Sequence, residues 1–204
     1  MRIGIDARFY GGEQSKGLGR YTQKLIEYLA RYDHENEYVI FLQQEGFNQW
    51  NITNTNFTPV LTPYRWYTLS EQLFMPWQIR KAKVDFMHFP HFNVPLLYRK
   101  PFVVTIHDLI INHFPTERAT TLGPLLYKIK HLAGQAVMRH AVRFSSTIIT
   151  VSEFSKQDIA EYYHIDSQKI AVTYEAAELD HQEVLSQESE KVLQQYGIDT
   201  PYFL

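Results

Sequence analysis

Histidines and an aspartate stand where apolar runs of this 204-residue sequence end. His88 and His91 lie in "HFPHF", and His107 and Asp108 follow the run "PFVVTI". A histidine in such a place can donate to a sugar hydroxyl or act as acid or base near neutral pH. The alternative, which we favour for an isolated histidine, is a purely structural role in which the imidazole ring hydrogen-bonds to the backbone.

The same residues raise the question of a metal, since two imidazoles and Asp108 could form a site. Pro90 lies between His88 and His91 and precludes a shared helical face. The sequence contains neither an H-E-x-x-H pattern nor a cysteine. We therefore predict no metal.

Gly17 and Gly19 belong to the stretch "GGEQSKGLGRYT", which joins an apolar run to a helical pattern. A dinucleotide fingerprint requires a third glycine where this sequence has Thr22, and a Walker loop requires G-K-[ST]. What remains is a long loop that brings both glycines to a helix N-terminus, where free N–H groups and the helix dipole favour an anion. A surface loop without a ligand is the alternative.

Two further helix starts carry capping residues. In "VSEFS", Ser152 is predicted to be an N-cap with Glu153 in the first turn, and Ser70 is predicted to cap an earlier helix. No G-x-S-x-G elbow is present, which argues against a hydrolase nucleophile.

The elements that must position these residues alternate between strand and helix. Apolar runs predict strands at 2–7, 37–42, 58–61, 84–89, 101–108, 146–152 and 169–175. Helical patterns occupy 20–32, 69–83, 120–144, 153–163 and 188–197, and "TPYFL" begins one more strand. The first helix is expected to pack through Tyr21, Leu25, Tyr28, Leu29 and Tyr32. This order predicts an α/β fold: a Rossmann-like parallel sheet with helices on both faces and ligands at the carboxyl ends of the strands.

The net charge of −2 argues against general nucleic-acid binding. Neither a signal-peptide pattern nor an apolar stretch of about 20 residues is present, which favours a cytoplasmic protein. Between Arg118 and Ser152 there is no acidic residue. The cations Lys128, Lys130, Arg139 and Arg143 are therefore candidates to face an anionic membrane; an ordinary helix with a solvated basic side is the alternative.

Taken in order, the motifs resemble the N-terminal half of family 4 glycosyltransferases, including bacterial mannosyltransferases, which have the two-domain GT-B architecture. The matching stretches are "IGIDAR", "GLGRYT", "SEQLFMPWQIRKAKVDFMHFPHFNVPLL", "PFVVTIHDLI", "NHFP", "IITVSEFSKQDIAEYY" and "KIAVTYEAAE". Each stretch alone is weak, and their order makes the resemblance specific.

The resemblance implies transfer of a sugar from a nucleotide-sugar to a glycan or glycolipid acceptor, with retention of configuration and without a metal or cofactor. It places Gly17, Gly19 and Arg20 near the donor phosphate. It assigns His107 and Asp108 to the catalytic centre. It puts Glu153, His88 and His91 on the acceptor side.

The resemblance also implies a division of the chain. Residues 1–184 correspond to the acceptor domain, and residues 185–204 to a linker helix and the start of a C-terminal donor domain, which this sequence does not contain. We expect inactivity unless that domain is supplied in cis or in trans. We expect the protein in the cytoplasm, peripheral on the inner face of the membrane. A non-catalytic module that binds a glycan or a membrane surface is the alternative function, and a Rossmann-like oxidoreductase is a weaker third.

Overall fold

The computed structural model describes residues 1–11, 16–114, 124–176, 186–198 and 200. In three of these segments the side chains are described from a later residue: from 17 in 16–114, from 130 in 124–176 and from 191 in 186–198. The chain forms two compact units, Met1–Tyr174 and Glu175–Leu204. The boundary predicted after residue 184, between an acceptor domain and the linker to a donor domain, concerns the two-domain GT-B architecture. It stays a prediction. The strand predicted in "TPYFL" lies outside the described residues.

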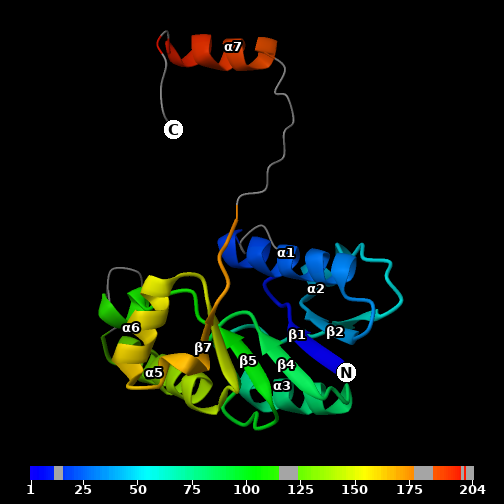
Figure 1. The fold of residues 1–204 in the computed structure, drawn as a ribbon, viewed down its shortest axis with the longest axis vertical. Coiled ribbons are helices and arrows are strands. Elements are labelled where there is room, and N and C mark those ends of the chain that lie inside the picture. Colours follow the sequence, from blue (N-terminus) through cyan, green and yellow to red (C-terminus); the bar gives the residue numbers. More distant parts are fainter. Residues whose placement is uncertain (12–15, 115–123, 177–185, 199, 201–204) are drawn as a thin grey trace. The chain divides into compact units, whose positions relative to one another are not determined.

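The first unit is built on one parallel sheet of seven strands in the order β3-β2-β1-β4-β5-β6-β7 (Figure 1). The strands are β1 (Arg2–Asp6), β2 (Glu37–Leu42), β3 (Phe57–Leu61), β4 (Phe86–Phe89), β5 (Phe102–Thr105), β6 (Thr147–Thr150) and β7 (Ile170–Val172). The direction of strand addition reverses at β1 and β4, which are neighbours in the sheet and distant in sequence. The predicted Rossmann-like parallel sheet is confirmed.

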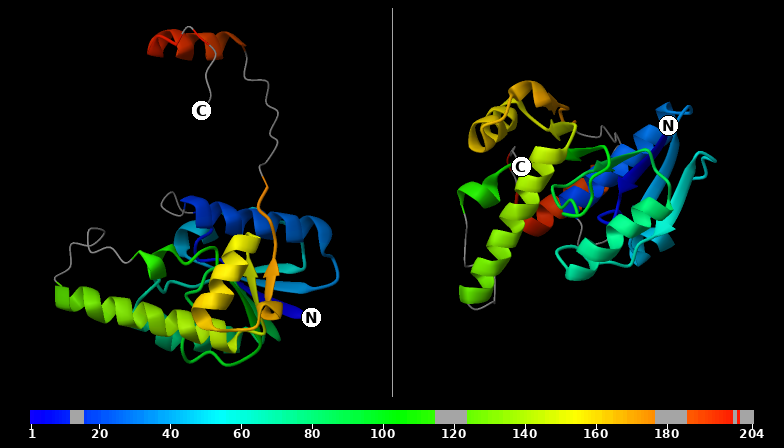
Figure 2. Two further views of the ribbon diagram at one scale, coloured as in Figure 1. Left: turned by 60° about the vertical axis from the view of Figure 1, so that its left-hand side comes forward. Right: turned by 90° about the horizontal axis from the view of Figure 1, so that it is seen from below.

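Helices connect the strands and cover the sheet on both faces (Figure 2). They are α1 (Lys16–Tyr32), α2 (Gln44–Asn48), α3 (Leu69–Lys81), α4 (Ile110–His113), α5 (Pro124–Phe144), α6 (Glu153–Tyr163) and the 3-10 turn η3 (Ser167–Lys169). The second unit contains α7 (Ser186–Tyr196). The five long helices were predicted, whereas α2, α4 and η3 were not.

Each sheet face has its own apolar core. On one face, Ile26 and Ala30 of α1 pack with Ile5 and Ile40. On the other face α3, α5 and α6 bury a larger cluster; its members include Met75, Ile79, Met138, Val142, Ile159, Met87, Phe89, Val104 and Ile148. The sheet is thus buried on both sides, which explains why its strands read as continuous apolar runs.

The predicted packing face of α1 is only partly right, since Leu29 packs against the smaller core and the two outer tyrosines do not. Tyr28 and Tyr32 are 50% and 69% exposed, whereas Ile26 and Ala30 face the core. The helix turns smaller residues toward the sheet, and the tyrosines stack on each other with their polar ends toward water.

Local capping chemistry was predicted with mixed success. Ser152 caps α6 by accepting from the Ser155 amide, as expected. Thr68, not Ser70, caps α3, because it is the residue with extended backbone whose hydroxyl reaches the Glu71 amide. α7 ends as predicted at Gly197, whose φ of 63° and the bond from Ile198 N to Leu193 O form a Schellman motif.

Gly4 in β1 allows a close approach between the sheet and its larger core. A Cβ at this position would collide with Met87 and lie 3.1 Å from the Phe41 ring. We expect Gly4→Ala to lower the free energy of unfolding by about 1–3 kcal/mol in urea titrations. Gly134→Ala in α5, where nothing lies within 4 Å of the added carbon, is the control and should raise it by about 0.5–1 kcal/mol. Equal effects at the two positions would contradict this account.

Candidate functional site

The switch point between β1 and β4 is the place where open parallel sheets bind ligands, in the crevice at the carboxyl ends of the strands. Asp6 ends β1, and His88 lies in β4 one residue before its end. The segments that follow these two strands, together with the start of α3 and the end of β5, supply the side chains described below.

The centre of this region is a buried ion cluster. The Arg8 guanidinium donates to Asp6 Oδ1 at 2.7 Å and Oδ2 at 2.6 Å, and to Glu71 Oε1 at 2.5 Å. Arg8 is 1% exposed and Glu71 is 0% exposed. Burial alone would lower the pKa of Arg8, but the charges of Asp6 and Glu71 raise it above its usual value. Arg8 therefore stays charged.

Glu71 extends this cluster to two further segments. Its Oε1 accepts from Asn93 Nδ2 at 2.5 Å, and its Oε2 accepts from the Tyr67 amide at 2.8 Å. Tyr67 has a φ of 58°, a left-handed conformation that costs a bulky side chain energy and persists only when its surroundings fix it. The Glu71 carboxylate thus connects three segments: the one after β1, which contains Arg8, the one after β4, which contains Asn93, and the entry to α3 at Tyr67.

Aromatic rings lie beside the ion cluster. Phe9 and Trp66 stack with centroids 4.3 Å apart, and His91 lies 5.3 Å from Phe9 and 6.3 Å from Tyr67. Trp66 Nε1 and Asn93 Oδ1 are buried without a hydrogen-bond partner in the structure. Buried polar atoms are normally paired, so both atoms are suited to bind a ligand or water here.

Three predicted histidines come together at this edge of the sheet. His88 Nε2 lies 2.9 Å from Thr105 Oγ1, which also lies 3.4 Å from the Tyr21 hydroxyl of α1. His107 lies edge-on to Tyr21 with centroids 4.8 Å apart. Its Nε2 lies 3.2 Å from Pro90 O, and because a carbonyl only accepts, this nitrogen carries the hydrogen. The polar chain thus joins α1, β4 and β5.

Burial makes two of these rings neutral at physiological pH. Burial, followed by the nearby His107, lowers the pKa of His88 to about 4. Burial likewise lowers the pKa of His91 to about 4, with His107 contributing and Asp6 opposing. Neutral imidazoles can donate and accept hydrogen bonds at once, which suits recognition of hydroxyl groups.

The other predicted site residues border this cluster or lie on its flanks. Gly17 and Gly19 lie in the first turn of α1, and Arg20 is exposed beside Tyr21. Asp108 is exposed and its Oδ1 accepts from the Ile110 amide at the start of α4. Glu153 is exposed in the first turn of α6, and nearby Ser155 donates to the His107 carbonyl at 3.1 Å.

The predicted membrane-facing cations lie apart from this site, on α5. Lys130, Arg139 and Arg143 are exposed, and the Lys128 side chain lies outside the described residues. Their contact with a membrane stays a prediction.

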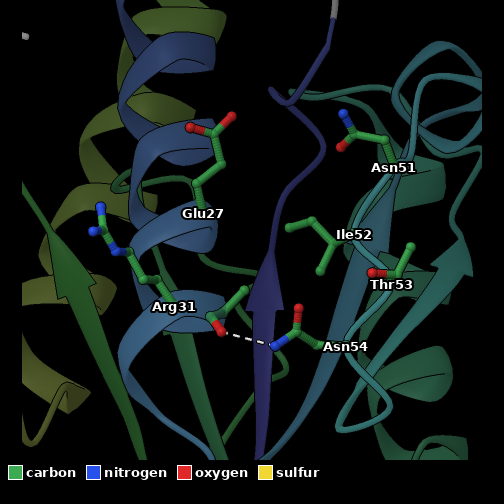
Figure 3. A pocket seen from close by; sticks show the side chains of 7 residues that line it. Glu27, Arg31, Asn51, Ile52, Thr53 and Asn54 are labelled. Atoms are coloured by element: carbon green, nitrogen blue, oxygen red, sulfur yellow. Dashed lines mark hydrogen bonds between the residues drawn. The ribbon is translucent and has the colours of Figure 1, made fainter.

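Among the described residues, no group of three or more His, Asp or Glu side chains is arranged to hold a metal ion. A hollow of about 270 Å³ lies between α1 and residues 51–54, where Asn54 Nδ2 donates to Ala30 O (Figure 3). Because α1 runs back toward the start of β2, this hollow lies toward the amino ends of the strands, away from the histidines.

Sequence reasoning missed the ion cluster. Asp6 and Arg8 form a charged pair directly after a buried strand, and this pattern could have been noticed. Glu71 is an acid in the first turn of a helix, a common helix-stabilising position, and its partner Arg8 is 63 positions away. Nothing in the local pattern distinguishes such a residue from a solvated one.

These features define the class of the protein: a doubly wound α/β domain with a candidate ligand site of polar side chains at its switch point. Residues 15–181 match the model of Glycosyltransferase Family 4. The chain therefore belongs to glycosyltransferase family 4.

The chain is also similar to proteins of bacterial surface-polysaccharide synthesis. It is 27% identical over 123 residues to the O-antigen chain mannosyltransferase RfbU of Salmonella typhimurium, an alignment that covers 60% of this chain and 31% of RfbU. It resembles the crystal structure of WaaG, a glycosyltransferase involved in lipopolysaccharide biosynthesis, with a TM-score of 0.60 and 13% identity. That match covers 97% of this chain and 52% of WaaG, so the chain spans about half or less of the relatives it matches.

The buried ion cluster leads to a stability prediction. Glu71→Gln should lower the free energy of unfolding by about 3–5 kcal/mol, because it leaves buried charge only partly compensated. Glu37→Gln is the matched control: it removes a 2.7 Å bond to Arg2 whose two side chains are 39% and 64% exposed, and should cost under about 1 kcal/mol. Chemical denaturation of both variants measures the difference. A small effect at Glu71 would show that the cluster contributes little to the fold.

The neutral histidines lead to a pH prediction. The native pKa values of His88 and His91 lie near 4 against an ordinary 6.5, so the unfolded chain binds more protons between these values. Stability should therefore fall as the pH drops through this window, by about 1.4 kcal/mol per pH unit for each histidine. Urea titrations at several pH values measure this slope.

The control distinguishes these rings from other histidines. His88→Gln should make the slope shallower, whereas His34→Gln, at an exposed position, should leave it unchanged. A wild-type chain with flat stability across this window would refute the assignment.

Proposed function

We propose that this chain is the acceptor-binding, N-terminal part of an enzyme that transfers a sugar from a nucleotide-sugar to a polysaccharide or lipid-linked acceptor, with retention of configuration. The observation that supports this proposal is the site of a family 4 chain. In it, His88, His91 and His107 lie beside a buried ion cluster at the switch point. Mannose is the proposed sugar, because RfbU is named as a mannosyltransferase.

The proposed roles follow the positions of the residues. His107 positions the transferred sugar, with Asp108 beside it. Glu153, His88 and His91 serve the acceptor side, where neutral rings hydrogen-bond hydroxyls without attracting a counterion.

Gly17, Gly19 and Arg20 face the donor phosphate at the start of α1, because the first amides of a helix and the helix dipole favour an anion. Catalysis then consists of positioning and charge stabilisation, without a metal or a cofactor.

A donor-binding domain completes this scheme, in cis or in trans, because most of the nucleotide-sugar contacts belong to the C-terminal half of the GT-B architecture. We propose that the enzyme acts in the cytoplasm, at the inner face of the membrane that carries its acceptor. Among the described residues, no helix combines the length and apolar character needed to cross a bilayer.

Transfer activity is tested with the chain alone and after mixing or fusion with the C-terminal domain of a family 4 mannosyltransferase. We expect nucleotide release from a nucleotide-linked mannose only when both parts and a lipid-linked or polysaccharide acceptor are present. His107→Ala should lower that rate by about 10²–10³-fold, a loss typical of removing a preorganised polar group. His34→Ala is the control and should retain the full rate. Ordinary turnover by the isolated chain would contradict the need for a donor domain.

Acceptor binding by the isolated chain is a separate measurement that needs no second domain. Saturation-transfer NMR should detect O-antigen-like oligosaccharides bound by the wild type and more weakly by His107→Ala. Binding without transfer, even with a donor domain supplied, would favour the alternative of a non-catalytic glycan-binding module.

A further inference from the structure

Helix α3 carries apolar side chains on two opposite faces. Met75 and Ile79 are fully buried in the larger core. Leu69, Leu73 and Trp77, spaced by one helical turn each, form an outward row with exposures of 82%, 59% and 58%, and Phe74 beside them is 50% exposed. A helix at a water-facing surface normally has polar residues opposite its buried stripe, so this outer face is suited to a partner.

Along residues 57–84, the segment that carries this outer face, the exposed charges have one sign. From Phe57 to Val84 the only acidic residue is Glu71, which is fully buried in the ion cluster. Arg80, Lys81 and Lys83 are exposed at the end of the helix, and Arg65 is exposed before its start. Lys81 Nζ lies 5.5 Å from the centre of the Trp77 ring. The exposed surface of this segment therefore combines large apolar side chains with cations and no anion.

A hollow lies along one side of the row. It measures about 350 Å³ and is lined by Val60 of β3 and by Trp77, Gln78, Lys81 and Ala82. β3 is the edge strand of the sheet, so this hollow opens at the edge of the molecule's first unit. An apolar wall with a lysine at its rim fits an acyl chain whose headgroup is anionic.

We infer that the outer face of α3, defined by Leu69, Leu73, Phe74 and Trp77, docks on a bilayer that contains anionic lipid. Helices that lie in a membrane interface have Trp, Phe and Leu on one face and Lys or Arg around it, which is the composition of this surface. Clustered cations without acids match the negative potential of an anionic leaflet. A protein partner would match the apolar row equally well but would not explain why the exposed charges of residues 57–84 are all cations.

The docking face borders the candidate site. Tyr67, two residues before α3, is 62% exposed and lies 6.3 Å from His91, and its amide is held by Glu71. A bilayer against the outer face of α3 would therefore present lipid-anchored groups beside the ring cluster. This face also differs from the α5 cations predicted from sequence, since the described part of α5 exposes mainly Leu132 and Phe144 as large apolar residues.

The test measures partition of the full chain into phosphatidylcholine vesicles with and without phosphatidylglycerol. The wild type should bind the anionic vesicles and dissociate from them as salt is added, because salt screens the attraction between exposed charges. Leu73→Ser with Trp77→Ser, and separately Arg80→Gln with Lys81→Gln, should each weaken that partition by roughly tenfold. These side chains are exposed, so circular dichroism should show an unchanged fold.

Two matched pairs serve as controls. Tyr28→Ser with Tyr32→Ser removes similarly exposed rings from α1, on the other sheet face, and Arg139→Gln with Arg143→Gln removes two cations from α5. Both should partition like the wild type. Brominated lipid should quench tryptophan emission in the wild type, and Trp77→Phe should lose most of that quenching.

Three results would overturn the inference: no binding to anionic vesicles, binding that only the α5 pair weakens, or α3 variants that bind normally. Light scattering would also overturn it if the α3 pair dissociated a dimer without changing vesicle binding, since a second copy would then be the occupant. The assay needs no sugar donor, so its failure is distinct from failure of the proposed transfer.

Discussion

The guanidinium of Arg8, shared between Asp6 and Glu71, is the interaction on which the site depends. A buried charge is tolerated only with partners, and here the partners come from the end of β1 and from α3, 63 positions further along the chain. Glu71 in turn holds Asn93 and the Tyr67 amide. One cation thus fixes three segments that a sheet alone would leave as independent loops. This arrangement supplies the fixed geometry that catalysis by positioning requires.

The histidines add a second constraint, because they share a crowded edge of the sheet. Protonation of His88 or His91 is opposed first by burial and then by His107, so the cluster favours neutral rings. A site that binds neutral hydroxyls benefits from this, since uncharged donors and acceptors need no counterion and can face a ligand from several strands. The buried charges of Asp6, Arg8 and Glu71 are instead paired with one another in the ion cluster.

The sequence predicted the fold well, because apolar runs and helix patterns alternate and each reflects a local period. Ser152 and Gly197 were predicted for the same reason, since capping depends on immediate neighbours. The packing face of α1 was predicted only in part: Leu29 packs against the core, whereas Tyr28 and Tyr32 resemble core residues in the pattern but are exposed. His88, His91 and His107 were found by their place after strands, whereas Glu71, Asn93 and Trp66 act through distant partners that no spacing reveals.

Helix α3 connects the ion cluster with the outer surface, because one of its faces is buried in the core and the other is exposed. Its inner face places Met75 and Ile79 in the core and Glu71 in the ion cluster, so the helix cannot rotate without breaking the site. Its outer row of Leu69, Leu73 and Trp77 is therefore fixed in direction by the same buried charge. A rigid apolar row, with the exposed cations Arg65, Arg80 and Lys81 in the same segment, would hold the first unit of the chain at one orientation on a bilayer. The ion cluster that fixes the ring site would then also fix how that site meets an acceptor anchored in lipid.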